Sequence, residues 1–368
     1  DEVRVDDLGE QIQGNGFTIL RSQLGGSPWE LEPPEVTQLM ETLRERGVPL
    51  AEYCGSKPYR GVLTGCNDAF LVDQGIRDRL GAEAPAAAEI LKPYLRGQDV
   101  ERWHANWRGL WLIAIKSSRD HHWPWTEASD ESSARGVFAS TYSSLDCHLS
   151  PFADRLKRRQ DKGRFWWELR SCSYYEALEG AKVVYSDIAW TPSFSLDQDG
   201  MFANNTVYFL QNGDPWITSI LNSPLLWWYS WRNAIHGKDE ALRLFSTYVE
   251  SIPIPVPNEE ARSLSNEIVE LLSEHSKTRM EAAASLADWL TVEHELAKIP
   301  KGLQSPFDLT EEAWVAAIRK ARGRKRPLSS AGLRTVRDEY SATIAPLRER
   351  QGEVGRLDRQ PERSASLD

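Results

Sequence analysis

The residues from Ile252 to Pro257 constrain the fold more than any other short stretch of this chain. They read Ile-Pro-Ile-Pro-Val-Pro, with a proline at every second position. Proline fixes φ, lacks a backbone N–H and pushes the residue before it out of the α region, so this stretch must be extended. It separates two parts of the chain that have different sequence patterns.

The part after Pro257 has the pattern of helices. Apolar or small residues recur at helical spacing from Asn258 to Leu296, which predicts a long amphipathic helix, either continuous or interrupted at a polar gap. Residues 309–321 and 330–347 predict two further helices. From Gln351 the sequence is polar and has no periodicity, so we expect residues 351–368 to be a disordered tail.

The part before Ile252 mixes short strand and helix signals. Apolar runs predict strands over residues 110–115, 182–188, 194–196 and 206–210. Helices are predicted over residues 35–46, 76–80, 84–91, 137–149, 152–160, 216–221 and 225–235. Apolar residues on both sides of Thr64-Gly65-Cys66-Asn67 are typical of a β-hairpin. The fold class is therefore α+β over residues 1–257, followed by a helical support or DNA-clamp region over residues 258–350.

Charge limits the ligands that such a chain can bind. The 368 residues carry a formal net charge of −10, which opposes nucleic-acid binding because phosphate neutralisation needs Lys and Arg. The distribution is uneven, since the first 50 residues are strongly acidic whereas residues 155–170 hold seven bases and two acids. Residues 319–326 hold six bases and no acid. An acidic chain with two basic stretches can still present a positive face to DNA.

Other classes of protein are disfavoured by what the sequence lacks. No apolar run approaches the roughly 18 residues that a membrane helix needs, so we expect no membrane contact. The four cysteines show no Cys-x-x-Cys spacing and the histidines add no zinc-ligand pattern, so we expect no metal site. Because the first residues do not resemble a signal peptide, the expected location is a bacterial or archaeal cytoplasm.

Several motifs follow one another in the first part of the chain. Residues 59–73 read Tyr-Arg-Gly-Val-Leu-Thr-Gly-Cys-Asn-Asp-Ala-Phe-Leu-Val-Asp, and residues 92–100 read Lys-Pro-Tyr-Leu-Arg-Gly-Gln-Asp-Val. Then come Phe-Trp-Trp-Glu-Leu-Arg at 165–170, Ala-Lys-Val-Val-Tyr at 181–185 and Asn-Asn-Thr-Val-Tyr-Phe-Leu at 204–210. In this order the motifs resemble the TaqI-type C-terminal specificity domain of adenine-N6 DNA methyltransferases and of fused, type IIG-like restriction-modification enzymes.

The resemblance implies sequence-specific recognition of double-stranded DNA. In such enzymes a methyltransferase domain lies upstream in the same polypeptide, flips an adenine out of the duplex and transfers a methyl group from S-adenosylmethionine. The Asn-Pro-Pro-Tyr type of catalytic loop is missing here, since the one Pro-Pro pair lies between Glu32 and Glu35. We therefore expect no catalytic residue and no cofactor in this chain, with about the first 50 residues as a connector from the upstream domain.

Basic side chains are the candidates for DNA contact, because Lys and Arg neutralise phosphates and Arg can read guanine. A solvated helix face is the ordinary alternative for such a charged run. For Arg96, DNA contact competes with an internal ion pair to Asp99 that fixes a turn at Gly97. Asn204 and Asn205 could read adenine or form a turn before a strand. The predicted DNA-binding residues are Arg96, Arg155, Lys157, Arg158, Arg159, Lys162, Arg164, Asn204, Asn205, Arg322, Arg324 and Lys325.

The motif residues themselves are predicted to build the scaffold. Gly and Asn tolerate positive φ, so the Thr-Gly-Cys-Asn segment suits a tight turn better than a DNA contact. Arg170 lies among aromatic and apolar residues, so we expect it to be buried or half-buried in an ion pair. The fifteen tryptophans, including Trp166-Trp167, could stack on bases but more often fill cores. The predicted scaffold residues are Thr64, Gly65, Asn67, Gly97, Asp99 and Arg170.

A second hypothesis belongs to a different class of protein. The long helix after Pro257 and the acidic N-terminal region could dock a partner subunit of a restriction-modification or phage-defence complex. The chain would then be a protein-interaction module, and DNA would be contacted elsewhere in the complex.

Overall fold

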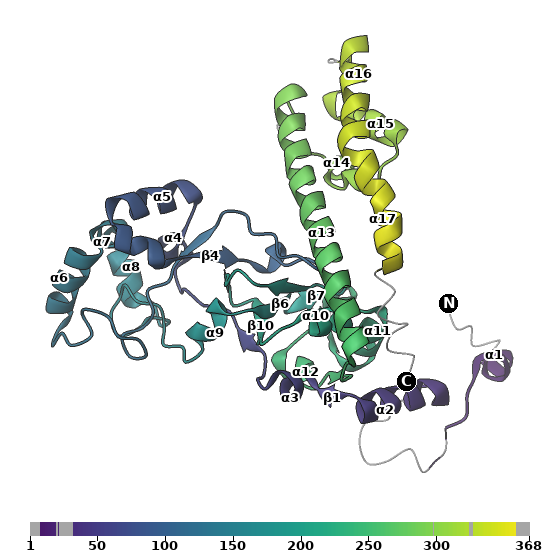
Figure 1. Ribbon diagram of the computed structural model, residues 1–368, viewed down its shortest axis with the longest axis horizontal. Helices are drawn as coiled ribbons and strands as arrows, with labels where there is room; N and C mark the ends of the chain where they lie inside the picture. Colours follow the sequence, from purple (N-terminus) through teal and green to yellow (C-terminus); the bar gives the residue numbers. More distant parts are fainter. Residues whose placement is uncertain (1–7, 20, 22–31, 297, 324–326, 358–368) are drawn as a thin grey trace.

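The computed structural model describes residues 8–19, 21, 32–296, 298–323 and 327–357. Strands and helices are mixed up to residue 257, and within the described residues only helices follow, which confirms the α+β class with a helical C-terminal region. In Figure 1 the C-terminal helices project from the mixed part as a separate bundle. None of the helices in the described part is long and apolar enough to cross a membrane.

The helices of the mixed part are short. The α-helices are α1 (Leu8–Asn15), α2 (Pro34–Arg46), α3 (Leu50–Cys54), α4 (Asn67–Phe70), α5 (Gln74–Glu83), α6 (Glu131–Thr141), α7 (Ser143–Leu149), α8 (Ala153–Arg158), α9 (Tyr175–Glu179), α10 (Pro215–Leu221), α11 (Pro224–Asn233) and α12 (Ser246–Val249). Single turns of 3-10 helix are η3 (Pro85–Glu89), η4 (Gly97–Asp99), η5 (Ser150–Phe152) and η6 (Lys238–Glu240).

The strands form small sheets rather than one large sheet. They are β1 (Val48–Pro49), β2 (Tyr59–Arg60), β3 (Leu71–Val72), β4 (Leu91–Leu95), β5 (Trp111–Ile113), β6 (Lys182–Ser186), β7 (Ile188–Ala189), β8 (Phe194–Asp197), β9 (Phe202–Ala203), β10 (Val207–Gln211), β11 (Ile235–His236), β12 (Leu242–Arg243) and β13 (Pro253–Ile254). Their orders are β2-β10-β6-β8, β3-β5-β4-β9, β11-β12-β7 and β1-β13. The pairs are antiparallel except β4 with β9, which is parallel.

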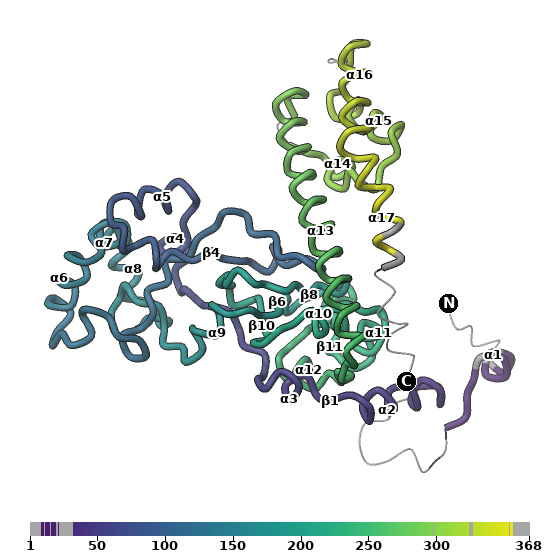
Figure 2. The backbone as a smooth tube through the Cα atoms, viewed as in Figure 1, coloured from purple at the N-terminus to yellow at the C-terminus, as the bar shows by residue number. Residues whose placement is uncertain are grey.

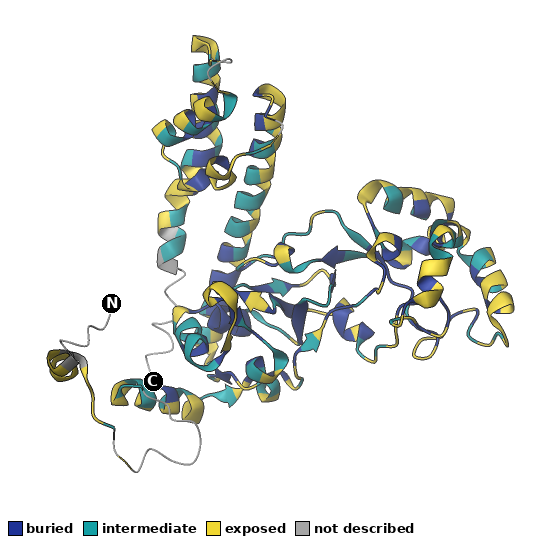
Figure 3. Cartoon of the chain, turned by 180° about the vertical axis from the view of Figure 1, so that it is seen from behind, coloured by how far each residue is buried: buried dark blue, intermediate teal, exposed yellow. Residues whose placement is uncertain are grey.

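The central sheet is buried on both faces, which explains why its strands read as continuous apolar runs. In β10, Val207 and Phe209 belong to one hydrophobic core, whereas Tyr208 and Leu210 belong to a second. Alternate side chains of a strand point to opposite faces, so this one strand contributes to both cores. Figure 3 shows the buried residues gathered around these strands. The first core extends into the lobe that holds α4 to α8, seen at the left of Figure 2.

The C-terminal helices begin directly after the proline stretch. The helix α13 (Glu259–Glu293) is continuous, and the Asn258 side chain caps it by accepting a hydrogen bond from the N–H of Ala261 at 2.8 Å. Its first half packs against Trp103, and its second half shares a core with the remaining helices. These are α14 (Lys301–Gln304), η7 (Pro306–Asp308), α15 (Glu311–Arg322), α16 (Ser330–Glu339), the π-turn η8 (Tyr340–Ile344) and α17 (Ala345–Leu357).

The predicted disordered tail is wrong for residues 351–357. These residues continue α17, which follows η8 without a break and whose Leu347 is buried in the third core. The remaining residues of the predicted tail, 358–368, lie outside the described part of the chain. The error came from reading a polar sequence as unstructured, whereas helix propagation from a packed start needs little further apolar contact.

The predicted hairpin around residues 62–72 is also wrong. Val62 forms a parallel bridge with Asn204, whereas β3 pairs with β5 about 40 residues downstream. Gly65 has a φ of +66°, as the turn prediction requires, but Asn67 then begins the short helix α4. The N–H of Val62 donates to the carbonyl of Ala203 in β9 at 2.7 Å. The two apolar runs therefore pair with different strands and not with each other, so the turn between them closes no hairpin.

Candidate DNA-binding surface

The basic stretch from Arg155 to Arg170 contains the last turn of a helix and a loop that folds back on itself. α8 ends at Arg158, and Lys162 forms an isolated antiparallel bridge with Leu169. The loop between them is held by the buried Glu168, whose Oε2 accepts from the backbone N–H groups of Arg164 at 2.7 Å and Phe165 at 3.1 Å. Its Oε1 accepts from the Trp125 indole at 2.9 Å. A buried carboxylate thus orders the loop that presents the basic residues.

Five of the predicted DNA-binding side chains in this stretch are exposed. Arg155 pairs with Asp68 at 2.9 Å, and Lys157 with Glu131 at 3.4 Å. Exposed pairs of this kind are weak, so they leave both cations able to exchange partners. The other three donate only to backbone carbonyls within the described structure and have no carboxylate partner there; they are Arg158, Lys162 and Arg164.

Arg159 is different, and our prediction that it contacts DNA is wrong. Its side chain is buried and donates to the backbone carbonyls of Thr64, Trp166 and Glu168. The guanidinium also lies 4.5 Å from the centre of the Phe70 ring. Burial lowers the pKa of Arg159 to about 10. Arg159 therefore ties two family motifs together from inside the lobe.

The prediction for Arg170 is also wrong, because this side chain is more exposed than expected. We expected a buried or half-buried pair, but the side chain is 52% exposed and contacts Asp161 at 3.5 Å. The aromatic residues before it, Trp166 and Trp167, are buried in the first core, so they fill the interior and do not offer rings to bases.

The scaffold role predicted for the other motif residues agrees with their contacts. Thr64 is buried, and its hydroxyl donates to the Asn67 side chain at 2.6 Å. Asp99 is fully buried and accepts from Nε of Arg96 at 2.9 Å and from its Nη2 at 3.0 Å. For Arg96 the structure therefore has the internal ion pair. Gly97 begins η4, where an added Cβ would lie 2.9 Å from the Thr206 hydroxyl.

The remaining predicted DNA-binding residues lie in three different settings. Asn204 forms the turn, because its Oδ1 accepts from the N–H of Thr206 at 3.1 Å and from its hydroxyl at 2.7 Å. The Asn205 side chain faces a small cavity. Arg322 is half-buried and contacts Nδ1 of His294 at 3.1 Å. Arg324 and Lys325 lie outside the described residues.

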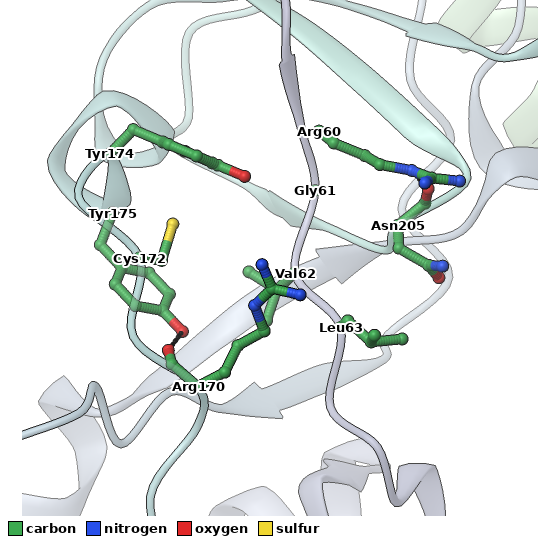
Figure 4. Close-up of a pocket in the computed structure, with 9 residues that line it drawn as sticks. All are labelled: Arg60, Gly61, Val62, Leu63, Arg170, Cys172, Tyr174, Tyr175 and Asn205. Carbon is green, nitrogen blue, oxygen red and sulfur yellow. Dashed lines mark hydrogen bonds between the residues drawn. The ribbon is translucent and has the colours of Figure 1, made fainter. Parts of the chain in front are cut away.

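The cavity beside Asn205 brings together residues that the sequence alone did not connect (Figure 4). Its volume is about 90 Å³, and it is lined by Arg60, Gly61, Val62, Leu63, Arg170, Cys172, Tyr174, Tyr175 and Asn205. Arg60 was not among the predicted site residues. Its position directly before Gly61, inside the first family motif, was the signal that could have identified it. No group of His, Cys, Asp and Glu residues in the described part could hold a metal ion.

Comparison with known proteins identifies the class of domain. Residues 92–254 match the model of the TaqI-like C-terminal specificity domain, and residues 258–362 match a domain of unknown function (DUF8810). Residues 92–254 thus belong to the TaqI-like specificity family, as the sequence motifs predicted. No curated protein matches the chain. The solved structure of the type IIL restriction-modification enzyme MmeI in complex with DNA is similar at a TM-score of 0.38 and 12% identity. The match covers 84% of this chain and 36% of that one.

Proposed function

We propose that this chain recognises a specific sequence in double-stranded DNA, as the specificity part of a restriction-modification adenine-N6 methyltransferase. The observation that carries the proposal is the family match of residues 92–254, within which one ordered loop presents exposed cations. Arg158, Lys162 and Arg164 lie there without a carboxylate partner in the described structure. Such charges neutralise phosphates and position a protein on a duplex.

The catalytic step belongs, in this proposal, to a methyltransferase domain upstream in the same polypeptide. That domain would bind S-adenosylmethionine and hold the flipped adenine. Residues 1–50 would connect it to the specificity part. Within the described residues of this connector, α2 packs on the second core through Met40, and Arg44 donates to the Tyr229 hydroxyl at 3.2 Å. These contacts would fix the direction in which the connector leaves the specificity part.

A selection experiment tests the proposal. The full chain is incubated with duplexes that carry a randomised central segment, and the bound duplexes are sequenced. We expect one motif to be enriched and the affinity to fall as salt rises, since released counterions drive phosphate contacts. Enrichment of no motif would refute sequence-specific recognition.

Charge-reversal variants show whether the basic loop takes part. Changing Arg158 and Arg164 to Glu should weaken binding to every duplex. The matched control is Arg337→Glu, because Arg337 is 57% exposed but lies in α16 of the helical region. Equal affinities of the loop variant and the control variant would exclude the loop from the DNA-binding surface.

A further inference from the structure

Three segments that are distant in the sequence line the cavity shown in Figure 4. One wall is the extended backbone from Arg60 to Leu63, the second is the loop from Arg170 to Tyr175, and Asn205 completes the third. The side chains of Arg170 and Tyr174 point toward the middle from one side, while Arg60 and Asn205 lie on the other. Both arginines are exposed, so the cavity opens to solvent with a positive charge on each side.

The charge of the cavity is unbalanced. Its nine lining residues include two arginines and no carboxylate. Arg60 has no ion pair within the described structure; its Nε donates to the backbone carbonyl of Asn205, and its guanidinium lies 5.6 Å from the centre of the Tyr208 ring. Arg170 has one carboxylate neighbour, Asp161, at the long distance of 3.5 Å and with both side chains exposed. An anion would therefore gain from entering.

Neutral donors face the same space. Burial is the largest influence on the Tyr174 hydroxyl and raises the pKa of Tyr174 to about 12, so this group remains protonated and can donate a hydrogen bond. The positive charges of Arg170 and Arg60 both lower the pKa of Tyr174 and so oppose that rise. The side-chain amide of Asn205 makes no hydrogen bond within the described residues and offers two further N–H groups.

The walls are held in place before any ligand arrives. Gly61 donates to the carbonyl of Val207 at 2.8 Å, and its added Cβ would lie only 2.1 Å from the carbonyl oxygen of Asn204. Only glycine permits so close an approach of two backbones. On the other side, the Tyr175 hydroxyl donates to the carbonyl of Arg170 at 3.0 Å. The backbone of both walls therefore loses little conformational freedom when a ligand binds.

We propose that this cavity holds one phosphate group of the DNA backbone between Arg60 and Arg170. The assignment rests on the proposed function and adds the chemistry of one contact to it. A phosphate presents only acceptor oxygens, which matches a cavity of cations and donors. Every base pair presents a donor as well as acceptors in the major groove, and these donors would find few acceptors here. The contact anchors the domain on the duplex and does not itself read sequence.

The test compares the variants Arg60→Gln and Arg170→Gln of the full chain with Arg337→Gln, an equally exposed arginine in α16. Affinity is measured between about 50 and 200 mM salt for the duplex selected by the wild-type chain and for a scrambled duplex. Each cavity variant should lower the slope of log affinity against log salt by about 0.9, the value for one phosphate. The affinity for both duplexes should fall by the same factor. The double variant should lose little more affinity than either single variant, because the two arginines share one phosphate.

The outcomes separate the two proposals. If the wild-type chain selects no sequence, the proposed function fails together with this inference. If it selects one but the cavity variants keep the control's affinity and slope, the phosphate contact alone is refuted. If the variants lose discrimination between the duplexes at an unchanged slope, the arginines read bases and the assignment to phosphate is wrong.

A second measurement distinguishes the DNA backbone from free phosphate. Inorganic phosphate is titrated into the wild-type chain and the double variant, and the phosphorus resonance is followed. One outcome is that the double variant loses the binding of inorganic phosphate and still binds DNA as tightly as the wild-type chain. That result would identify a free-anion site and overturn the proposal.

Discussion

Arg158 and Arg159 are neighbours in sequence with opposite environments, and they allow a matched test of the fold. The side chain of Arg158 is exposed and donates to the carbonyl of Asp154 at 3.0 Å, one turn earlier in the chain. Arg159 is buried and donates to three carbonyls from two other segments. We expect Arg159→Met to lower the stability of the lobe without removing a DNA contact. We expect Arg158→Met to weaken DNA binding and leave the stability unchanged.

The loss of stability follows from the three hydrogen bonds. A hydrogen bond from a charged donor contributes about 1.5–3 kcal/mol, so three contribute about 5–9 kcal/mol together. Burial of the charge, which lowers the pKa of Arg159 to about 10, opposes this by about 3 kcal/mol. The net destabilisation by Arg159→Met is therefore about 2–6 kcal/mol, whereas Arg158→Met should change stability by less than about 0.5 kcal/mol.

Urea unfolding followed by tryptophan fluorescence measures the difference, because Trp125, Trp166 and Trp167 report on the same core as Arg159. With a slope of about 2 kcal/mol per molar urea, the midpoint of Arg159→Met should fall by about 1–3 M. The DNA salt slope should fall by about 0.9 in Arg158→Met alone. An unchanged urea midpoint in Arg159→Met would refute the scaffold role of Arg159. If that variant also had a reduced salt slope for DNA binding, Arg159 would be a DNA contact after all.

Three other expectations concern buried charges. Lys182 and Asp197 are both fully buried and 2.5 Å apart, so Lys182→Met should lower the free energy of unfolding by about 3–5 kcal/mol. The double variant with Asp197→Asn should recover part of this loss, because it removes the unpaired charge and keeps one acceptor oxygen for the N–H groups of Asp199 and Met201. Asp99→Asn weakens the pairs with Arg96 and Arg108 and should lower the urea midpoint, whereas an unchanged midpoint would mean that these pairs contribute nothing. Finally, burial lowers the pKa of several histidines, so the unfolded chain binds protons at a higher pH than the folded chain. Urea midpoints should therefore fall as the pH drops below about 6.5. A flat profile would contradict the full or partial burial of His104, His148, His275 and His294.

Local patterns in the sequence were sufficient for much of the secondary structure. The predicted helix over residues 35–46 is α2, and the long helix after Asn258 is α13. The strands β6, β8 and β10 also lie where apolar runs predicted them. Each of these signals depends on residues a few positions apart, such as an N-cap, a proline or a periodic apolar face. The family motifs are likewise local strings, and the family match confirms what they predicted for residues 92–254.

Tertiary structure decided which residues form the surface. Arg159 is buried because Thr64, almost a hundred positions earlier, supplies one of its acceptors. Arg60 and Arg170 face one cavity because β2 pairs with β10 and places its end beside the loop after Leu169. The exposure and partners of a side chain depend on which distant segment packs against it, and no local pattern contains that information. The sequence alone therefore determined the class of domain and the extended break at Ile252 to Pro257, whereas packing between distant segments decided which arginines can meet a phosphate.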